Sequence, residues 1–325
     1  GPAGGGLATA LFGLRAGKRD VISFDMGGTT AKACMIEDGQ AEVAPMMEAG
    51  RIHRFKKGSG LPIKAPVIDM IEIGAGGGST AAVDEVGLLK VGPQSAGSDP
   101  GPACYGMGGM QPTVTDANLI LGYYDPGFFL GGRMSLDMEA ARAAMARVGS
   151  QLGLSVEATA AGIHKVVVES MASAARVYLV EKGKDPRAYA MVGFGGPGPA
   201  HVAEVAAALG VKEVIIPPAS GAASALGFLA APLSFENARS MPVEFKLGWN
   251  AQAVNEVLNS LVEQASRNLI EAGISPETIV TECSADMRLV GQMHDIAVPL
   301  PAGPLTEQSL DAIRAAFIAV YARRY

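Results

Sequence analysis

The sequence has few charged and aromatic residues and almost no cysteine or histidine. Charged residues make up 18% and aromatic residues 6% of its 325 residues, and only three cysteines occur, with no CxxC pair. The four histidines, which show no HxH or HxxxH spacing, are His53, His164, His201 and His294. The sequence therefore indicates neither a disulfide framework nor a zinc site, and its cysteine usage favours a reducing, cytoplasmic location.

Basic clusters and long apolar runs are also missing. Lys and Arg total 26 against 32 Asp and Glu, for a formal net charge of −6, which argues against a nucleic-acid surface. No uninterrupted apolar run reaches the roughly 18 residues of a membrane-spanning helix. We therefore expect neither nucleic acid nor a membrane as a partner.

What the sequence does have is apolar residues and glycine. Hydrophobic residues make up 49% of the chain, which is enough for a large core, and its length suggests two domains of roughly 150 residues each. Its 42 glycines are well above the usual share of about 7%. They lie in short clusters without a collagen period, which predicts backbone that closely approaches a neighbour or a ligand.

The two ends of the sequence predict an internal piece of a longer protein. It begins Gly1-Pro2-Ala3-Gly4 without an initiator Met, and it stops at Tyr325 within an expected amphipathic helix that starts near Thr306. We therefore expect part of any site to lie outside these residues.

The pattern of apolar residues and turn signals predicts an α/β fold with a domain boundary near residue 235, where the glycine density falls. A Gly-Gly turn joins two strands as a hairpin, and Asp137 and Ser155 are expected helix caps. A loop-rich stretch is expected over 92–132. The expected strands are Val21–Asp25, Ala31–Ile36, Ala188–Phe194, Val211–Pro217, Pro242–Leu247, Glu282–Val290 and His294–Pro299. The expected helices run from Asp137 to about Ser150, Ser155 to about Lys182, Ala200 to Leu209 and Ala251 to Ala272.

The helix that follows Ser155 carries apolar residues at spacings of three and four, which predicts one continuous buried stripe. Its members are Ile163, Val166, Val167, Met171, Ala174, Val177 and Val180.

The first candidate for chemistry is the segment Asp25–Thr30, with the sequence DMGGTT, at the end of a strand. Glycine backbone N–H groups and threonine hydroxyls suit phosphate oxygens, and the Asp25 carboxylate suits a hydrated Mg²⁺. An ordinary hairpin turn explains the same residues equally well.

A second candidate is the glycine-rich segment 193–201, with the sequence GFGGPGPAH, between a strand and a helix. Gly193, Gly195 and Gly198 satisfy the G-x-G-x-x-G dinucleotide pattern, but the next strand ends without the carboxylate that this pattern requires. A glycine loop at a helix N-terminus remains, suited to a nucleotide, with a plain tight turn as the alternative. We expect Gly196 and Gly198 to tolerate no side chain, because the backbone must come close to the nucleotide and the following helix must pack tightly.

Two further features have weaker signals. Gly74–Ser79 contains three consecutive glycines, which are typical of either a crowded site or a flexible loop. Cys104 lies in a loop without a nearby histidine, which favours a structural role over a nucleophilic one.

Seven segments in chain order resemble the hydantoinase A/5-oxoprolinase family, which includes the A-type polypeptide of N-methylhydantoinase and the beta subunits of acetone and acetophenone carboxylases. The resemblance covers essentially the whole chain. The segments are Gly1–Gly5, Asp25–Thr29, Ile73–Ser79, Gly92–Tyr105, Pro112–Ala117, Phe194–His201 and Ala285–Gln292.

The resemblance implies the second lobe of an actin-like ATPase fold over residues 1–235 and the start of a smaller α+β C-terminal domain over 236–325. It implies ATP with Mg²⁺ or Mn²⁺ as cofactors, a small-molecule substrate, a hydantoinase B-type subunit or domain as partner, and an N-terminal lobe that this chain lacks. Without that lobe, we expect residues 1–325 to bind ATP weakly at best and not to hydrolyse it.

By the same resemblance, Asp25–Thr30 matches a second phosphate loop and Gly195–His201 an adenosine-side loop. Lys32 departs from the family pattern DMGGTSTD, in which a carboxylate stands at this position, and it is expected to neutralise phosphate charge instead. The implied cofactor-binding residues are Asp25, which is also the implied metal ligand, Gly27, Gly28, Thr29, Thr30, Lys32, Gly195, Gly196, Gly198 and His201.

The leading expectation for function is the ATP-handling subunit of an amidohydrolase that acts on hydantoin-like or oxoproline-like rings. The same motifs allow the beta subunit of a ketone carboxylase. A third interpretation is a nucleotide-binding scaffold without turnover, to which the Lys32 departure gives some weight.

Overall fold

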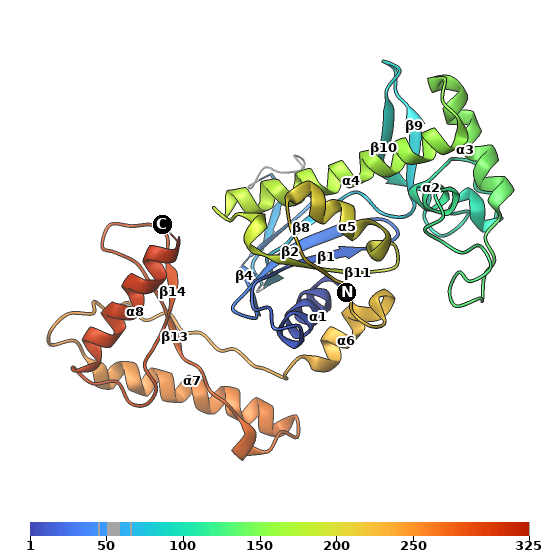
Figure 1. Cartoon of the computed structure of the whole chain (residues 1–325). Coiled ribbons are helices and arrows are strands. Elements are labelled where there is room, and N and C mark those ends of the chain that lie inside the picture. The colour runs from blue at the N-terminus through green and yellow to red at the C-terminus, as the bar shows by residue number, and fades with distance from the viewer. Residues whose placement is uncertain (45, 51–58, 66, 325) are drawn as a thin grey trace. The chain divides into compact units, whose positions relative to one another are not determined.

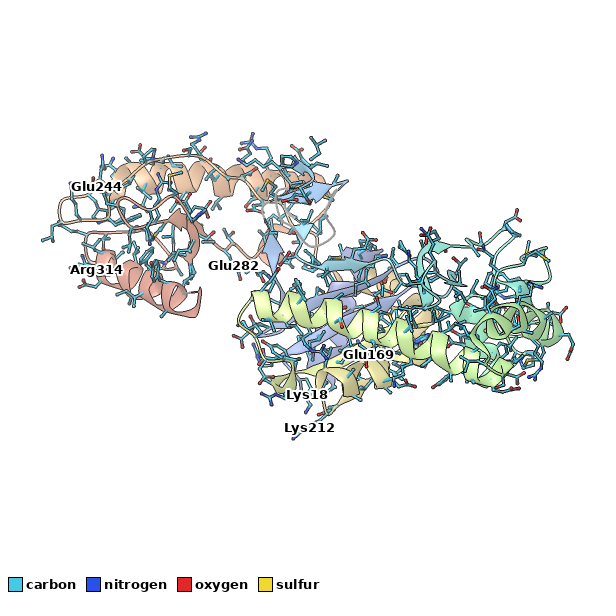
Figure 2. The ribbon with its side chains drawn as sticks, turned by 90° about the horizontal axis from the view of Figure 1, so that it is seen from above. Lys18, Glu169, Lys212, Glu244, Glu282 and Arg314 are labelled. Atoms are coloured by element: carbon cyan, nitrogen blue, oxygen red, sulfur yellow. The ribbon has the colours of Figure 1, made fainter. Side chains whose placement is uncertain are left out.

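The computed structural model describes residues 1–44, 46–50, 59–65 and 67–324, so His53 lies outside the described residues. It forms two compact units, Gly1–Ala231 and Pro232–Tyr325 (Figure 1). Exposed charged side chains occur on both units, for example Glu169 and Lys212 on the first and Arg314 on the second (Figure 2).

A mixed six-stranded sheet forms the centre of the first unit. Its strand order is β12-β11-β1-β2-β3, and β8 also pairs with β2. β1 runs antiparallel to β2, which confirms the predicted hairpin, and parallel to β11. β11 runs parallel to β12, which confirms the predicted parallel strand–helix–strand unit. The strands are β1 (Val21–Met26), β2 (Ala31–Glu37), β3 (Gln40–Ala41), β8 (Ile71–Ile73), β11 (Ala190–Phe194) and β12 (Val214–Ile215). β12 is shorter than predicted.

Helices cover both faces of this sheet, as Figure 1 shows. Helices α4 (Val156–Glu181) and α5 (Gly198–Leu209) pack on the face that receives Ile22 and Phe24 of β1. Helices α1 (Pro2–Arg15) and α6 (Ala223–Ala230) pack on the opposite face, which receives Val21. Because side chains alternate along a strand, Asp25 projects to the α1 and α6 side.

The predicted buried stripe of α4 is confirmed from Ile163 to Ala174, except that Val166 is partly exposed, and it is wrong at its end. Met171 and Ala174 are buried, but Val177 and Val180 are 41% and 63% exposed. Steps of three residues lag behind the helical period of 3.6, so the stripe rotates away from the sheet. Tyr178 and Leu179 occupy the buried positions at this end of the helix instead.

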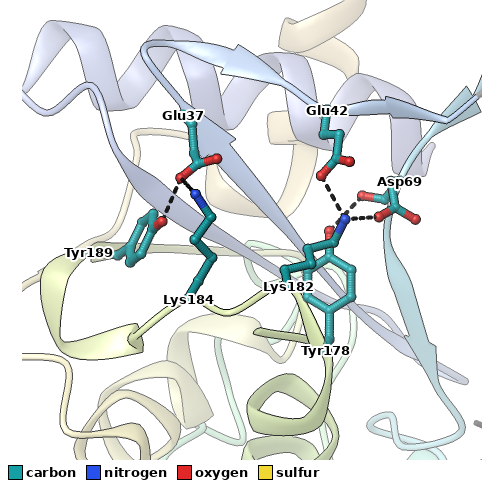
Figure 3. A network of polar contacts seen from close by, with 7 residues as sticks. All are labelled: Glu37, Glu42, Asp69, Tyr178, Lys182, Lys184 and Tyr189. Atoms are coloured by element: carbon teal, nitrogen blue, oxygen red, sulfur yellow. Dashed lines mark hydrogen bonds and ion pairs between the residues drawn. The ribbon is translucent and has the colours of Figure 1, made fainter. Parts of the chain in front are cut away.

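Two lysines hold the C-terminal end of α4 to the edge of the sheet (Figure 3). The Lys182 ammonium lies 2.6 Å from the Glu42 carboxylate and also pairs with Asp69. The Lys184 ammonium lies 2.7 Å from the Glu37 carboxylate, which also accepts a hydrogen bond from the Tyr189 hydroxyl.

The expected N-caps of two helices are confirmed. The Asp137 carboxylate accepts from the backbone N–H of Ala140 at the start of α3 (Met138–Leu152), and the Ser155 hydroxyl accepts from that of Ala158 in α4. The stretch 92–132 is not wholly loop, because a capping box starts α2 (Val114–Ile120) within it. The short strands of this unit are β4 (Val43–Ala44), β5 (Met47–Ala49), β6 (Leu61–Ile63), β7 (Val67–Ile68), β9 (Ser79–Val83) and β10 (Leu89–Ser95).

The described residues of the second unit form two α-helices, a short 3-10 helix (Pro276–Thr278) and an antiparallel strand pair. The pairing places Ser284 opposite Pro299. The predicted strand Pro242–Leu247 is wrong: Val243 and Phe245 pack against the cluster around Trp249, but their backbone pairs with no strand among the described residues. The elements are α7 (Ala251–Glu271), β13 (Ser284–Met287), β14 (Ile296–Pro299) and α8 (Ser309–Arg324).

Candidate functional site

Asp25 lies at the carboxyl end of β1, where the sequence predicts it, and the tight turn to β2 follows. The Gly27 N–H donates to the Thr30 carbonyl at 2.9 Å, which closes this turn. The Asp25 carboxylate accepts a hydrogen bond of 3.3 Å from the Ser224 hydroxyl at the start of α6. Burial raises the pKa of Asp25, and the positive charge of Lys32 offsets part of that rise. The site thus holds a carboxylate that lacks most of its ordinary hydration.

The second glycine cluster packs directly on this turn. The Gly77 N–H donates to the Gly27 carbonyl at 3.1 Å, and the Gly78 N–H donates to the Gly28 carbonyl at 2.6 Å. A Cβ added at Gly76 would lie 2.6 Å from the Gly28 carbonyl. This geometry supports the crowded-site interpretation of Gly74–Ser79, because two backbones meet here at a distance that excludes any side chain.

The third glycine loop meets the same turn from β11. Gly195 has a φ of +89°, and a Cβ there would lie 2.2 Å from the Met26 carbonyl and 2.7 Å from an Asp25 carboxylate oxygen. Pro197 lies beside Gly77, whose added Cβ would lie 3.4 Å from the proline ring. Three glycine-rich loops therefore converge at the carboxyl ends of the parallel strands β1 and β11, which is where ligands bind in open α/β sheets.

The packing expectation for two glycines of this loop is wrong. A Cβ at Gly196 would meet nothing within 4 Å, and one at Gly198 would make only ordinary contacts of 3.7 Å with Met26. A Cβ at Gly28 likewise would meet nothing within 4 Å. The backbone at Gly28 and Gly196 is therefore accessible at the converging loops, and the protein's own packing does not require glycine at either position.

Lys32 stands opposite Asp25 in the β1–β2 register and opposite Glu72 in the β2–β8 register. Its ammonium donates to the Thr30 hydroxyl and lies 3.5 Å from the Glu72 carboxylate. Lys32 is thus held at the end of the turn by an acidic residue of the neighbouring strand.

The structure does not bring His201 to the turn with the other expected site residues. Its side chain is fully buried, and its Nε2 lies 2.9 Å from the Asn118 amide nitrogen of α2. Its ring stacks on that of His164, with 4.5 Å between the ring centroids. Burial and the nearby His164 lower the pKa of His201 to about 3, so that its imidazole is neutral. Sequence reasoning missed Asn118 and His164 as its partners, because they come from elements far apart in the chain.

Cys104 has the structural role that its sequence context favours. Its side chain is fully buried, and its backbone N–H donates to the buried Asp116 carboxylate at 2.7 Å. Burial, together with the charge of Asp116, raises the pKa of the Cys104 thiol well above its usual range. A thiol that resists ionisation is a poor nucleophile.

The donors at the converging loops fit magnesium bound through a nucleotide. Within the described part of the chain, no group of three or more His, Cys, Asp or Glu residues could hold a metal by itself. Mg²⁺ commonly takes only one or two carboxylates and completes its shell with phosphate oxygens and water. Asp25 beside accessible glycine backbone meets that requirement. Among the same described residues, no helix has the length and apolar character needed to span a membrane.

The chain is similar to known proteins over its whole length. A family model described as hydantoinase/oxoprolinase matches residues 1–237, and one described as the hydantoinase/oxoprolinase C-terminal domain matches residues 245–325. The chain is 40% identical over 306 residues to an uncharacterized protein of Methanocaldococcus jannaschii and 36% identical over 321 residues to the alpha subunit of caprolactamase from Pseudomonas jessenii. These matches cover 92% and 98% of this chain but 44% and 45% of those proteins, so the chain spans about half the length of these relatives.

Two solved structures have the same fold. A nucleotide-free structure of acetone carboxylase, described as ATP-dependent, matches with a TM-score of 0.81 and 26% identity. The ATP-dependent caprolactamase of Pseudomonas jessenii matches with a TM-score of 0.78 and 34% identity. The matches cover 99% and 100% of this chain and 46% of each of those chains.

Proposed function

Because the chain belongs to the hydantoinase/oxoprolinase family, we propose that it handles ATP in an enzyme that hydrolyses a cyclic amide of the hydantoin or 5-oxoproline type. The observation that carries this proposal is the convergence of three glycine loops beside Asp25. Relatives named as caprolactamase and as 5-oxoprolinase, at 36% and 31% identity, support the substrate class.

The residues at the converging loops have distinct proposed tasks. Asp25 would hold Mg²⁺ or Mn²⁺, and the accessible backbone at Gly28 would approach phosphate oxygens. The accessible backbone at Gly196 would approach the adenosine side of the nucleotide. When bound, ATP would supply a phosphoryl group that turns the amide oxygen into a leaving group. Phosphoryl transfer asks a protein mainly to position phosphates and neutralise their charge, which glycine loops and one carboxylate can do without a protein nucleophile.

The rest of the site is proposed to come from outside this chain. We propose that residues 1–235 form the second lobe of an actin-like ATPase and that residues 236–325 begin a C-terminal domain. Since the relatives are about twice as long, their additional residues would supply the opposite lobe and its phosphate loop. Relatives are named as the alpha subunit of caprolactamase and the beta subunit of acetone carboxylase, which supports a partner polypeptide, proposed here to be of the hydantoinase B type.

An ATP-dependent ketone carboxylase is the second candidate. It is supported by the acetone carboxylase structure, whose TM-score of 0.81 is slightly higher than the 0.78 of caprolactamase. Sequence identity favours the amidase, at 34% against 26% for the two structures. Neither comparison separates the chemistry performed on the substrate, because the two activities share the nucleotide loops.

The test is an assay of the complete protein together with its partner polypeptide. Phosphate release from ATP is measured with hydantoin, 5-oxoproline or caprolactam, and separately with acetone or acetophenone plus bicarbonate. The proposal expects release that depends on a cyclic amide. Release that depends only on ketone and bicarbonate would establish the carboxylase instead, and absence of any nucleotide turnover would favour the scaffold.

A further inference from the structure

A buried hydrogen-bonded chain links the surface of the first unit to His201. The Glu204 carboxylate lies 3.1 Å from Nε2 of His164, and Nδ1 of His164 lies 3.0 Å from the Asn118 carbonyl oxygen. The Asn118 amide nitrogen then lies 2.9 Å from Nε2 of His201. Glu204 is about half exposed, whereas Asn118 and His201 are fully buried. The chain therefore runs from solvent to the interior.

The donor and acceptor capacities of these groups fix the direction of each hydrogen bond. The Glu204 carboxylate can only accept, so Nε2 of His164 donates to it, and both ring nitrogens of His164 carry protons in this network. The carbonyl oxygen of Asn118 can only accept, so Nδ1 of His164 donates to it. The amide nitrogen of Asn118 can only donate, so Nε2 of His201 accepts from it. The remaining amide hydrogen of Asn118 points to the Tyr124 hydroxyl at 3.2 Å. Since His201 is neutral, its single ring proton must lie on Nδ1.

The two helices that carry Asn118 and His201, α2 and α5, also hold two of the three converging loops. α2 carries Asn118 and, one turn earlier, Thr115, whose N–H and hydroxyl both donate to the Gly77 carbonyl at 2.8 and 2.9 Å. α5 carries His201 in its first turn, directly after the Gly195–Gly198 loop. The bond between Asn118 and His201 therefore joins the helix that holds the second glycine cluster to the helix that begins at the third loop.

We propose that Glu204, His164 and Asn118 hold His201 in its Nδ1–H tautomer, and that His201 thereby positions the Gly195–Gly198 loop for the nucleotide. The ligand in this inference rests on the proposed function, whereas the tautomer is a property of the chain itself. His201 is then a positioning residue that acts from behind the loop. Its Nδ1, which is buried and has no protein partner among the described residues, carries the proton.

The tautomer is tested by ¹⁵N NMR of the histidine side chains in the whole 325-residue chain. The expected spectrum at about pH 5 has a protonated Nδ1 and an unprotonated Nε2 at His201, with both ring nitrogens of His164 protonated. An Nε2–H tautomer, or a His201 ring that titrates near the ordinary histidine pKa of about 6.5, would overturn the inference.

Asn118→Asp is the decisive variant because a carboxylate cannot donate to Nε2. We expect the His201 proton to move to Nε2 in this variant. The Kd for ADP with Mg²⁺, measured by isothermal titration on the complete protein with its partner, should rise about tenfold. That is the size seen when orienting groups behind metal ligands are removed. Tyr124→Phe is the matched control: it removes another partner of Asn118, and both the tautomer and the Kd should stay as in the parent chain.

The outcomes separate this inference from the proposed function. If the complete parent protein with its partner binds no ADP at millimolar concentration, the proposed function and the positioning role fail together, while the tautomer is still judged by the spectrum. If the complete protein carrying Asn118→Asp binds ADP as tightly as the complete parent protein does, only the positioning role is overturned. Should Asn118→Asp fail to fold, Asn118→Ala replaces it, with a mixture of both His201 tautomers and weaker ADP binding as the expected result.

Discussion

Lys32 on β2 stands directly opposite Asp25 on β1, at the end of the strand pair where three glycine loops converge. Burial raises the pKa of the Asp25 carboxyl, and the lysine charge lowers it part of the way back. The lysine is itself held by Glu72 at 3.5 Å. This pairing keeps a poorly hydrated carboxylate beside a turn that presents accessible backbone.

Asp25→Asn should stabilise the fold at neutral pH. The pKa of Asp25 is higher in the folded state than in the unfolded state, where it is about 3.9. Ionisation of this carboxyl therefore lowers the free energy of unfolding as the pH rises from the unfolded-state pKa through the folded-state pKa. The gain in Tm from Asp25→Asn should therefore be largest above the folded-state pKa and vanish in acid. Thermal melts from pH 3 to 8 test this. A gain that grows toward low pH would contradict it, and Glu169→Gln on the exposed face of α4 is the control without effect.

Gly195→Ala and Gly196→Ala should behave in opposite ways although the two residues are adjacent. Gly195 has a positive φ, and a Cβ there would clash with the Met26 carbonyl, so Gly195→Ala should lower the free energy of unfolding by about 2 kcal/mol or more. At Gly196 a Cβ meets no protein atom within 4 Å, so Gly196→Ala should keep the parent Tm and weaken nucleotide binding. Melting curves and ADP titration measure both, and a strongly destabilised Gly196→Ala would refute this account of the loop.

Asp116→Asn should destabilise the first unit. The buried carboxylate accepts from the N–H groups of Cys104 at 2.7 Å and Thr113 at 2.8 Å, and from the Thr113 hydroxyl at 2.8 Å. An amide has one acceptor oxygen in place of two, so we expect a loss of about 2–4 kcal/mol in urea unfolding. Asp137→Asn is the matched control, because Asn caps a helix as well as Asp does. Equal stability of the two variants would contradict this role of Asp116.

The three cysteines should differ sharply in alkylation. Burial raises the pKa of the Cys34 thiol to about 12 and that of Cys104 further, whereas Cys283 is partly exposed. Iodoacetamide at pH 8 should therefore label Cys283 first and the other two only after denaturant is added. Peptide mass spectrometry measures the labelled fractions. Rapid labelling of native Cys104 would reopen a nucleophilic role for it.

Local sequence signals correctly predicted the elements that depend on residues close together in the chain. The caps at Asp137 and Ser155 and the Gly-Gly hairpin after Asp25 depend on residues within a few positions, and the structure has all of them. The predicted strand Pro242–Leu247 failed because a strand needs a partner, and these residues instead supply Val243 and Phe245 to the Trp249 cluster. Pairing is a long-range property that alternation along one segment does not reveal.

The candidate site could likewise be predicted from the sequence only in part. The glycine loops at Asp25 and Gly195 were predicted because clustered glycines indicate a backbone that closely approaches another group. The surroundings of His201 were not predicted. Asn118 and His164 contact it but lie 83 and 37 positions away along the chain, and no spacing rule links residues so far apart. His201 belongs to the motif Phe194–His201, but this motif alone does not determine whether its imidazole faces a ligand or the protein interior.

The most direct test of the proposed nucleotide site is Mg·ATP turnover by the complete protein with its partner, compared between the parent and Asp25→Ala. Removing the carboxylate that would hold the metal should lower turnover by a factor of about 100 or more, while the circular dichroism spectrum and the Tm show an intact fold. Turnover by a folded Asp25→Ala variant at the parent rate would contradict the assignment of the three converging loops as the nucleotide site.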